Sequence, residues 1–189
     1  MSLASVRRKP IMPNNLFGTL VFVLTEIMFF MALISAFIII KGNNPKFSVP
    51  EGLVLPIALT SVNTAILVLS GVLLFLCGRA MKRKESIEVV EKLLLASLIG
   101  GTIFVSVQGF EWVQLIRFGM TMQSSIFGGC FFLLIGTHGL HALAALLVML
   151  YVWGILRAGK LRLDHIQSLQ TFWFFVVGIW PVLYSLVYF

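Results

Sequence analysis

Long apolar runs separated by short polar stretches make up the chain from residue 16 onwards. Each run has about 20 residues or more, the length that an α-helix needs to cross the hydrocarbon core of a bilayer. The pattern predicts an all-α, polytopic membrane protein in which a polar tail, 1–15, precedes a single membrane bundle, 16–189. Five transmembrane helices are expected near 16–40, 53–77, 93–117, 125–151 and 171–189.

The composition agrees with a membrane protein. Of the 189 residues, 59% are hydrophobic and only 11% are charged, and the mean hydropathy is +1.03. Soluble domains contain about 25% charged residues. A net charge of +7 would indicate a nucleic-acid partner for a soluble protein, but here the basic residues lie in the polar connectors. We therefore expect membrane lipids, and no nucleic acid, among the partners.

The basic residues are distributed unequally between the two sides of the predicted bundle. Cytoplasmic loops of membrane proteins carry an excess of Lys and Arg. With the N-terminus in the cytoplasm, three basic residues lie outside, namely Lys41, Lys46 and Arg117. The other eleven lie inside, and five spans then place the C-terminus outside. The inside residues are Arg7, Arg8, Lys9, Arg79, Lys82, Arg83, Lys84, Lys92, Arg157, Lys160 and Arg162.

Glu26 is the most unusual residue of the first span. It lies about eleven residues into the predicted helix, hence about 15 Å from its start and close to mid-membrane. A carboxylate at that depth is costly unless it is protonated, paired or hydrated. Glu26 is therefore a candidate proton-binding or lipid-binding group. The alternative is a protonated side chain that only forms a hydrogen bond to a neighbouring helix.

His138 and His141 lie near the middle of the fourth span. A spacing of three residues puts them on one side of a helix, and the similar depth predicts contact with Glu26. Haem or metal ligation would need further ligands, and the one other histidine, His165, lies in a polar connector. A buried histidine with a hydrogen-bond partner is the simpler interpretation.

A second polar cluster is expected on the second and third spans. Gln108, Glu111 and Gln114 share a broad face of the third helix. Asn63, on the second helix, is expected to bridge two helices. The cluster fits either an interfacial packing role or a functional polar pocket.

Five short motifs follow one another along the chain. They are TEIMFF at 25–30, NTAILVLSG at 63–71, QGFEW at 108–112, SSIFGGCFFLLIGTHGLHAL at 124–143 and FWFFVVGIWPVLYSLVY at 172–188. In content and order they resemble subunit III of the haem-copper terminal oxidases, which oxidise cytochrome c or quinol. The G-x-H-G-x-H pattern around His138 and His141 is the most specific of them.

The resemblance implies the shorter, five-helix form of this subunit, in a bacterial cytoplasmic membrane. Such a chain is a non-catalytic accessory subunit of a proton-pumping respiratory complex and binds no haem or copper, which lie in partner subunits. It packs against oxidase subunit I and other oxidase subunits, supports proton uptake and stability, and holds phospholipid. Glu26, His138 and His141 match the family's intramembrane carboxylate and paired histidines, and Glu111 matches a family glutamate.

Two departures from the family pattern indicate a divergent branch. Phe174 and Val177 stand where the closing motif usually has His and Asp. Gly78 and Arg79 follow Cys77 where the family usually has a His. A larger respiratory supercomplex is therefore a further candidate partner.

Three alternatives to an oxidase subunit remain open on sequence grounds. The related accessory subunit of nitric-oxide reductases shares the motifs. A free-standing proton or solute transporter would use Glu26 and the histidines itself. A membrane cytochrome would use His138 or His141 as axial ligands.

Overall fold

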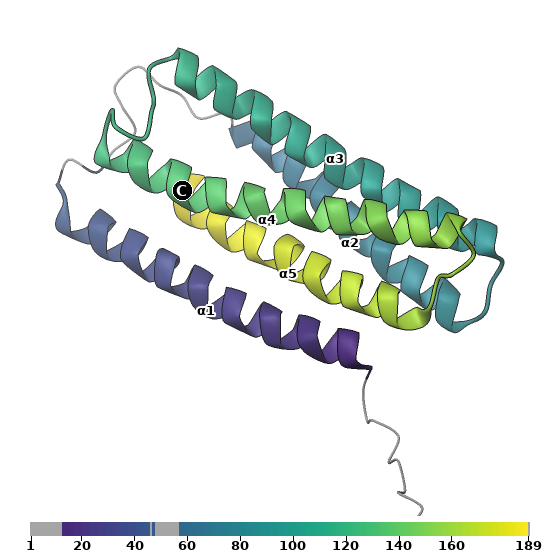
Figure 1. The fold of residues 1–189 in the computed structure, drawn as a ribbon. Helices are drawn as coiled ribbons and strands as arrows, with labels where there is room; N and C mark the ends of the chain where they lie inside the picture. The colour runs from purple at the N-terminus through teal and green to yellow at the C-terminus, as the bar shows by residue number, and fades with distance from the viewer. Residues whose placement is uncertain (1–12, 46, 48–56, 189) are drawn as a thin grey trace, which may run out of the picture.

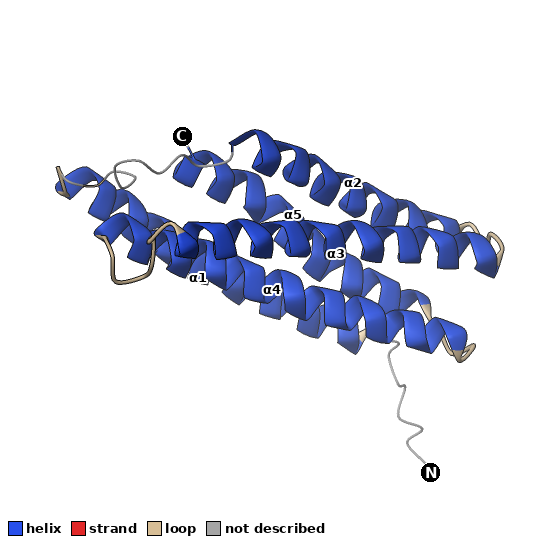
Figure 2. Ribbon diagram, turned by 90° about the horizontal axis from the view of Figure 1, so that it is seen from above, coloured by secondary structure: helices blue, strands red, loops and turns tan. Residues whose placement is uncertain are grey.

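Five long helices form the whole of the fold in the computed structural model, which describes residues 13–45, 47 and 57–188 (Figure 1). Each of the five is long and apolar enough to cross a membrane, which confirms the prediction of an all-α, multi-pass protein. The helices run up and down in one bundle (Figure 2). They are α1 (Asn14–Asn43), α2 (Ile57–Lys82), α3 (Ile87–Arg117), α4 (Ile126–Arg157) and α5 (Leu163–Tyr188).

Four helices extend at least five residues further towards the basic end of the bundle than predicted. α2 continues to Lys82 instead of 77 and α4 to Arg157 instead of 151, while α3 begins at Ile87 instead of 93 and α5 at Leu163 instead of 171. These extra turns are amphipathic. Val90 and Ile166 are buried, while the charged residues around Val90 face outward. Because these turns contain many charged residues, the hydropathy pattern alone assigns them to connectors. The predicted start of α2 at 53 lies outside the described residues.

Tight turns at this end join α2 to α3 and α4 to α5. Gly159 ends α4 with a φ of +68°, and the Lys160 amide donates back to the Ile155 carbonyl at 3.1 Å. A glycine adopts this left-handed conformation without steric cost. Lys84 takes the equivalent place after α2 with a φ of +57°, and the Glu85 amide donates to the Ala80 carbonyl. The α2–α3 turn therefore carries a small conformational strain that sequence inspection does not reveal.

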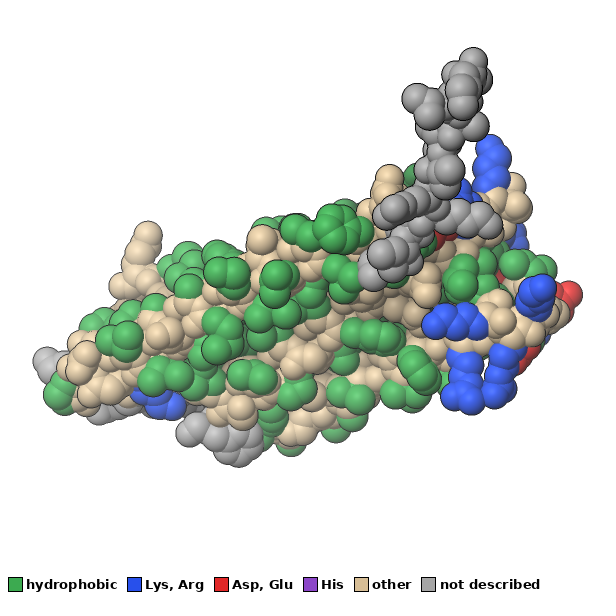
Figure 3. Space-filling view, turned by 90° about the horizontal axis from the view of Figure 1, so that it is seen from below, with side chains coloured by type: hydrophobic (Ala, Val, Ile, Leu, Met, Phe, Trp, Pro, Cys, Tyr) green, Lys and Arg blue, Asp and Glu red, His purple; other side chains and the backbone are tan. Residues whose placement is uncertain are grey.

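α5 lies at the centre of the bundle and contacts α1, α2 and α4, while α3 packs on α2 and α4. Trp173 and Trp180 of α5 are fully buried, and so is Phe30 of α1. The outer surface is largely apolar (Figure 3), as expected for helices that face lipid. The helix that follows the last polar connector is thus the core of the bundle.

The basic residues gather at one end of the bundle, where Figure 3 shows most of the Lys and Arg side chains of that face. Of those described, eight lie at the end of α2, in the first turns of α3 or in the turns between α2 and α3 and between α4 and α5, with Arg157 as the last residue of α4. Lys41 and Arg117 lie at the opposite end. This asymmetry is the one on which the predicted orientation rests. The orientation itself stays a prediction.

Two of the departures from the family pattern fall where α5 packs on α2. Gly78 leaves room for the side chain of Gln170, whose Nε2 donates to the Leu74 carbonyl of α2 at 2.8 Å. A Cβ at position 78 would overlap that amide. Val177 packs on Gly71, with 3.3 Å between its Cγ1 and an ideal Cβ at that glycine. An amide and an apolar contact thus hold together this part of the α2–α5 interface.

Candidate functional site

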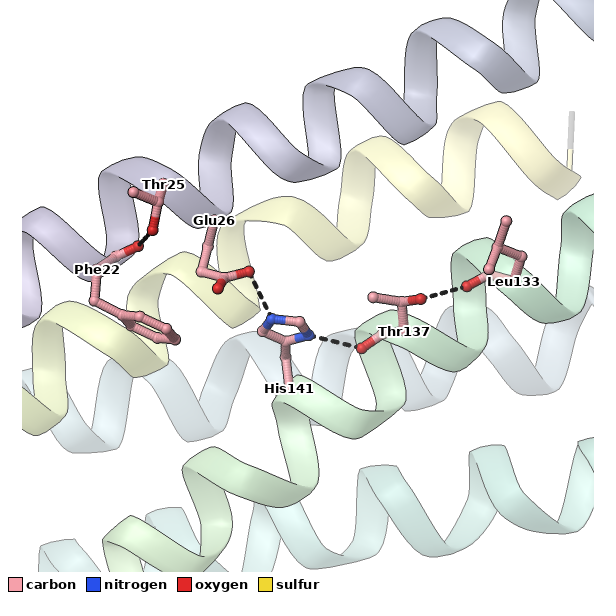
Figure 4. A network of polar contacts seen from close by, with 6 residues as sticks. All are labelled: Phe22, Thr25, Glu26, Leu133, Thr137 and His141. Carbon is pink, nitrogen blue, oxygen red and sulfur yellow. Dashed lines mark hydrogen bonds and ion pairs between the residues drawn. The ribbon is translucent and has the colours of Figure 1, made fainter.

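Glu26 and His141 form a direct pair in the middle of the bundle. The Glu26 Oε2 lies 2.8 Å from the His141 Nε2, and the His141 Nδ1 lies 2.8 Å from the Thr137 carbonyl oxygen (Figure 4). The predicted contact between Glu26 and the fourth span is therefore confirmed. α1 supplies the carboxyl group and α4 supplies the imidazole.

The hydrogen bonds of His141 restrict where protons can be. A carbonyl oxygen can only accept, so His141 Nδ1 must carry a hydrogen. The Nε2 contact then has two forms. A neutral imidazole accepts a proton from a carboxylic acid, or an imidazolium donates to a carboxylate. Both forms carry no net charge, which suits a pair inside an apolar bundle.

Aromatic rings surround this pair. The imidazole of His141 lies 5.2 Å from the ring of Phe30 and 6.4 Å from those of Phe29 and Phe175, measured between ring centroids. The side chains of His141 and Glu26 are 14% and 17% exposed. With few polar neighbours, the two groups interact in a low-dielectric environment where a hydrogen bond between them is strengthened.

The hydroxyl groups nearest the pair bind to their own helices. Thr25 Oγ1 donates to the Phe22 carbonyl at 2.7 Å, and Thr137 Oγ1 donates to the Leu133 carbonyl at 2.7 Å (Figure 4). Threonine commonly makes such a bond within a helix. The threonine of the TEIMFF motif is thus not a hydrogen-bond partner of Glu26 in this structure.

His138 has different surroundings, although it lies one turn away on the same helix. Its ring is 1% exposed and stacks on Trp180, with 5.0 Å between centroids and 29° between planes. Phe30 and Phe104 pack edge-on against it. Among the described residues, neither ring nitrogen has a hydrogen-bond partner. The expectation of a bonded histidine therefore fits His141 but not His138.

The second polar cluster assembles around Glu111. Thr60 Oγ1 lies 3.0 Å and 3.2 Å from the two carboxyl oxygens, and Gln108 Nε2 donates to Oε2 at 3.0 Å. Asn63 bridges α2 and α3 as expected, but its Nδ2 donates to the Phe104 carbonyl at 3.0 Å. Gln114 is exposed and takes no part in this cluster. The sequence analysis predicted that Gln108 and Glu111 lie in one cluster, but it did not predict that Thr60 donates a hydrogen bond to the Glu111 carboxyl group.

Trp180 lies between His138 of α4 and Thr64 of α2. Its Nε1 donates to Thr64 Oγ1 at 2.8 Å, and Thr64 Oγ1 donates to the Thr60 carbonyl at 2.7 Å. Since Trp180 also stacks on His138, it contacts α4 through a ring stack and α2 through a hydrogen bond. Sequence analysis did not single out Trp180, for which the only available signal was its place in the closing motif.

The described residues contain no group of three or more His, Cys, Asp or Glu side chains close enough to hold a metal ion. The paired site therefore offers one imidazole and one carboxyl group, arranged to share a proton.

Comparison with known proteins agrees with the motifs. The family model described as cytochrome c oxidase subunit III matches residues 8–189. The chain is 34% identical over 181 residues to cytochrome c oxidase subunit 3 of Corynebacterium diphtheriae, covering 91% of this chain and 86% of that protein. It is 32% identical over 179 residues to the subunit 3 of Synechocystis sp., covering 92% and 75%.

A third relative combines two subunits in its name. The chain is 26% identical over 177 residues to the heme-copper oxidase subunit I+III of Aeropyrum pernix, covering 89% of this chain and 22% of that protein. The match to the family model extends over all five helices of the bundle. The chain therefore belongs to the cytochrome c oxidase subunit III family, in its five-helix form.

Proposed function

We propose that this chain is the non-catalytic accessory subunit of a haem-copper oxygen reductase in aerobic respiration, and that Glu26 and His141 form an intramembrane proton site within it. Other oxidase subunits are its partners, as family membership implies. Haem and copper belong to those partners. The observation that carries the proposal is the 2.8 Å contact between Glu26 and His141 near the middle of two apolar helices.

The pair can move a proton at low electrostatic cost. Transfer between the Glu26 carboxyl and the His141 Nε2 changes the charge on each group but leaves the net charge of the pair unchanged. A neighbouring subunit that changes the local field shifts the proton along this bond. In this way the pair supports proton uptake in the adjacent catalytic subunit without ligating any cofactor.

Subunit I is the proposed neighbour. The Aeropyrum pernix relative, whose name joins subunits I and III, supports a position beside subunit I. The partial exposure of Glu26 and His141 allows a phospholipid to lie against the pair. We place the N-terminus in the cytoplasm and the C-terminus outside a bacterial cytoplasmic membrane. The reason is that most Lys and Arg residues lie at the end of the bundle where α1 begins.

The test uses the purified oxidase complex with Glu26→Gln in this chain. The variant keeps the shape of the carboxyl group but can neither lose nor gain the shared proton. We expect an unchanged haem spectrum, slower proton uptake and severalfold faster inactivation during turnover. Glu85→Gln is the matched control, because Glu85 is exposed at the basic end. Loss of haem from the Glu26→Gln complex, or turnover behaviour equal to that of the control, contradicts the proposal.

A further inference from the structure

Glu111 is a buried carboxyl group without a charged partner among the described residues. It is 1% exposed, and the ion pairs within the described part of the chain belong to Glu26, Glu91 and Asp164. Arg117, which ends the same helix, is exposed. A carboxylate inside an apolar bundle is costly without a counter-charge. A neutral, protonated acid avoids this cost.

The contacts of the carboxyl group suit a neutral acid as well as a carboxylate. Thr60 Oγ1 lies 3.0 Å from Oε1, and a hydroxyl group can donate or accept a hydrogen bond. Gln108 Nε2 donates to Oε2 at 3.0 Å. An acid with its proton on Oε1 therefore donates to Thr60 while Oε2 still accepts from Gln108. Without the proton, both neighbours donate to the carboxylate.

Two polar atoms beside Glu111 are without a well-formed hydrogen bond among the described residues. They are the Tyr188 hydroxyl of α5, which interacts with Glu111 and Gln108, and the Gln108 Oε1. A hydroxyl group supplies a further donor to a carboxylate, and an amide oxygen supplies a further acceptor to a carboxylic acid once the amide rotates. The cluster can therefore satisfy Glu111 in both protonation states, which a fixed packing contact does not require.

The ligand that fits this cluster is a proton. The unpaired atoms of Gln108 and Tyr188 are enclosed by the bundle, so neither a side chain of another protein nor a hydrated cation can reach them. The described residues also contain no group of His, Cys, Asp and Glu side chains that could hold a metal ion. A proton needs no cavity, only a base with hydrogen-bond partners.

The groups around Glu111 leave its charge uncompensated when the proton is lost. α5 faces it with Tyr188, whose ring lies 5.1 Å from that of Tyr184. α2 contributes the hydroxyl of Thr60, and no hydrogen bond or ion pair reaches Glu111 from the described residues of α4. Gain or loss of this proton therefore changes the net charge of the bundle, unlike proton transfer within the pair of Glu26 and His141.

We propose that Glu111 is a second proton-binding group of this chain, protonated at rest and ionised when the surrounding field favours the carboxylate. On ionisation the Tyr188 hydroxyl turns to donate to the carboxylate. The group lies about 9 Å along α3 from Arg117, near the end of the bundle opposite the basic end. It does not depend on the pairing of Glu26 with His141, so the two proton sites stand or fall separately.

Infrared difference spectroscopy of the complex in lipid detects this proton, because the C=O stretch of a carboxylic acid is well separated from carboxylate bands. We expect an acid band at neutral pH that is lost in Glu111→Gln and that disappears from the wild type as the pH is raised. Glu88→Gln, at an exposed position in the first turn of α3, is the control and should keep the band. No band assignable to Glu111 overturns the proposal. So does a band that stays unchanged at every pH at which the helical circular dichroism is retained.

Tyr188→Phe tests the same cluster while Glu111 stays in place. The variant leaves the carboxylate with one donor fewer, so the acid band should persist to a higher pH than in the wild type. Tyr151→Phe, on the exposed face of α4, is the matched control and should titrate as the wild type does. Equal titration of the wild type and both variants overturns the two-state cluster. This comparison remains available if Glu111→Gln fails to fold.

Discussion

The contact between Gly78 and Gln170 allows a quantitative prediction about the α2–α5 interface. Gly78→Ala adds a methyl group where the Gln170 amide now lies, so the amide must leave the Leu74 carbonyl. A partly buried amide without its partner costs about 1–3 kcal/mol. Alanine recovers up to about 1 kcal/mol through its higher helix propensity. We expect Gly78→Ala to lower the free energy of unfolding by about 1–2 kcal/mol.

The same substitution has the opposite sign once the amide is removed. In a Gln170→Ala background the added methyl group meets no amide, and Gly78→Ala becomes neutral or stabilising. The double-mutant cycle then gives a coupling free energy of about 2 kcal/mol. The measurement is reversible unfolding of the chain in mixed detergent micelles, followed by circular dichroism. Gly154→Ala, which meets no atom within 4 Å, is the control. An equal effect of Gly78→Ala in both backgrounds refutes this account of the interface.

Three further substitutions test the second polar cluster, the hydrogen bond between Trp180 and Thr64, and the α2–α3 turn. Glu111→Leu leaves Thr60 and Gln108 without their shared acceptor, so it should lower thermal stability by more than Glu111→Gln. Equal melting temperatures of the Glu111→Leu and Glu111→Gln variants would contradict the hydrogen bonds assigned to Glu111. Trp180→Phe keeps an aromatic ring against His138 but loses the bond to Thr64. The cavity left by the smaller ring is the same in both backgrounds, so we expect Trp180→Phe to cost about 1 kcal/mol more in the wild-type chain than in a Thr64→Val background. Lys84→Gly relieves the left-handed conformation of the α2–α3 turn and should raise the unfolding free energy by about 1 kcal/mol. A decrease would show that the turn is unstrained.

The hydrophobic pattern was sufficient to predict the five helices and the bundle. It failed at helix ends, where charged residues share a turn with buried ones. Val90 and Ile166 are buried within segments that the pattern assigns to connectors. Residues with long charged side chains extend a helix beyond the apolar run, because their charged heads reach water while the helix continues.

The pair at the centre of the proposal could be predicted from depth and residue type. A mid-membrane Glu and a mid-membrane His have few ways to avoid the cost of burial, so each is the natural partner of the other. Thr60 and Trp180 could not be predicted in the same way. Threonine usually bonds its own helix, as Thr25 and Thr137 do here, and a tryptophan in a span is commonly a packing residue. Their roles depend on how α2 and α5 turn towards α3 and α4, which the hydrophobic pattern does not determine.

The most direct test of the shared proton is nitrogen-15 solid-state NMR of the complex labelled at the histidines of this chain. Only His138, His141 and His165 contribute signals, and single His→Asn variants assign them. We predict that Glu26→Gln shifts the His141 Nε2 signal, because the carboxyl partner is lost, while His165 keeps its signals. Glu85→Gln should change neither. A His141 spectrum that is identical in the wild-type and Glu26→Gln complexes would contradict the pairing on which the proposed function depends.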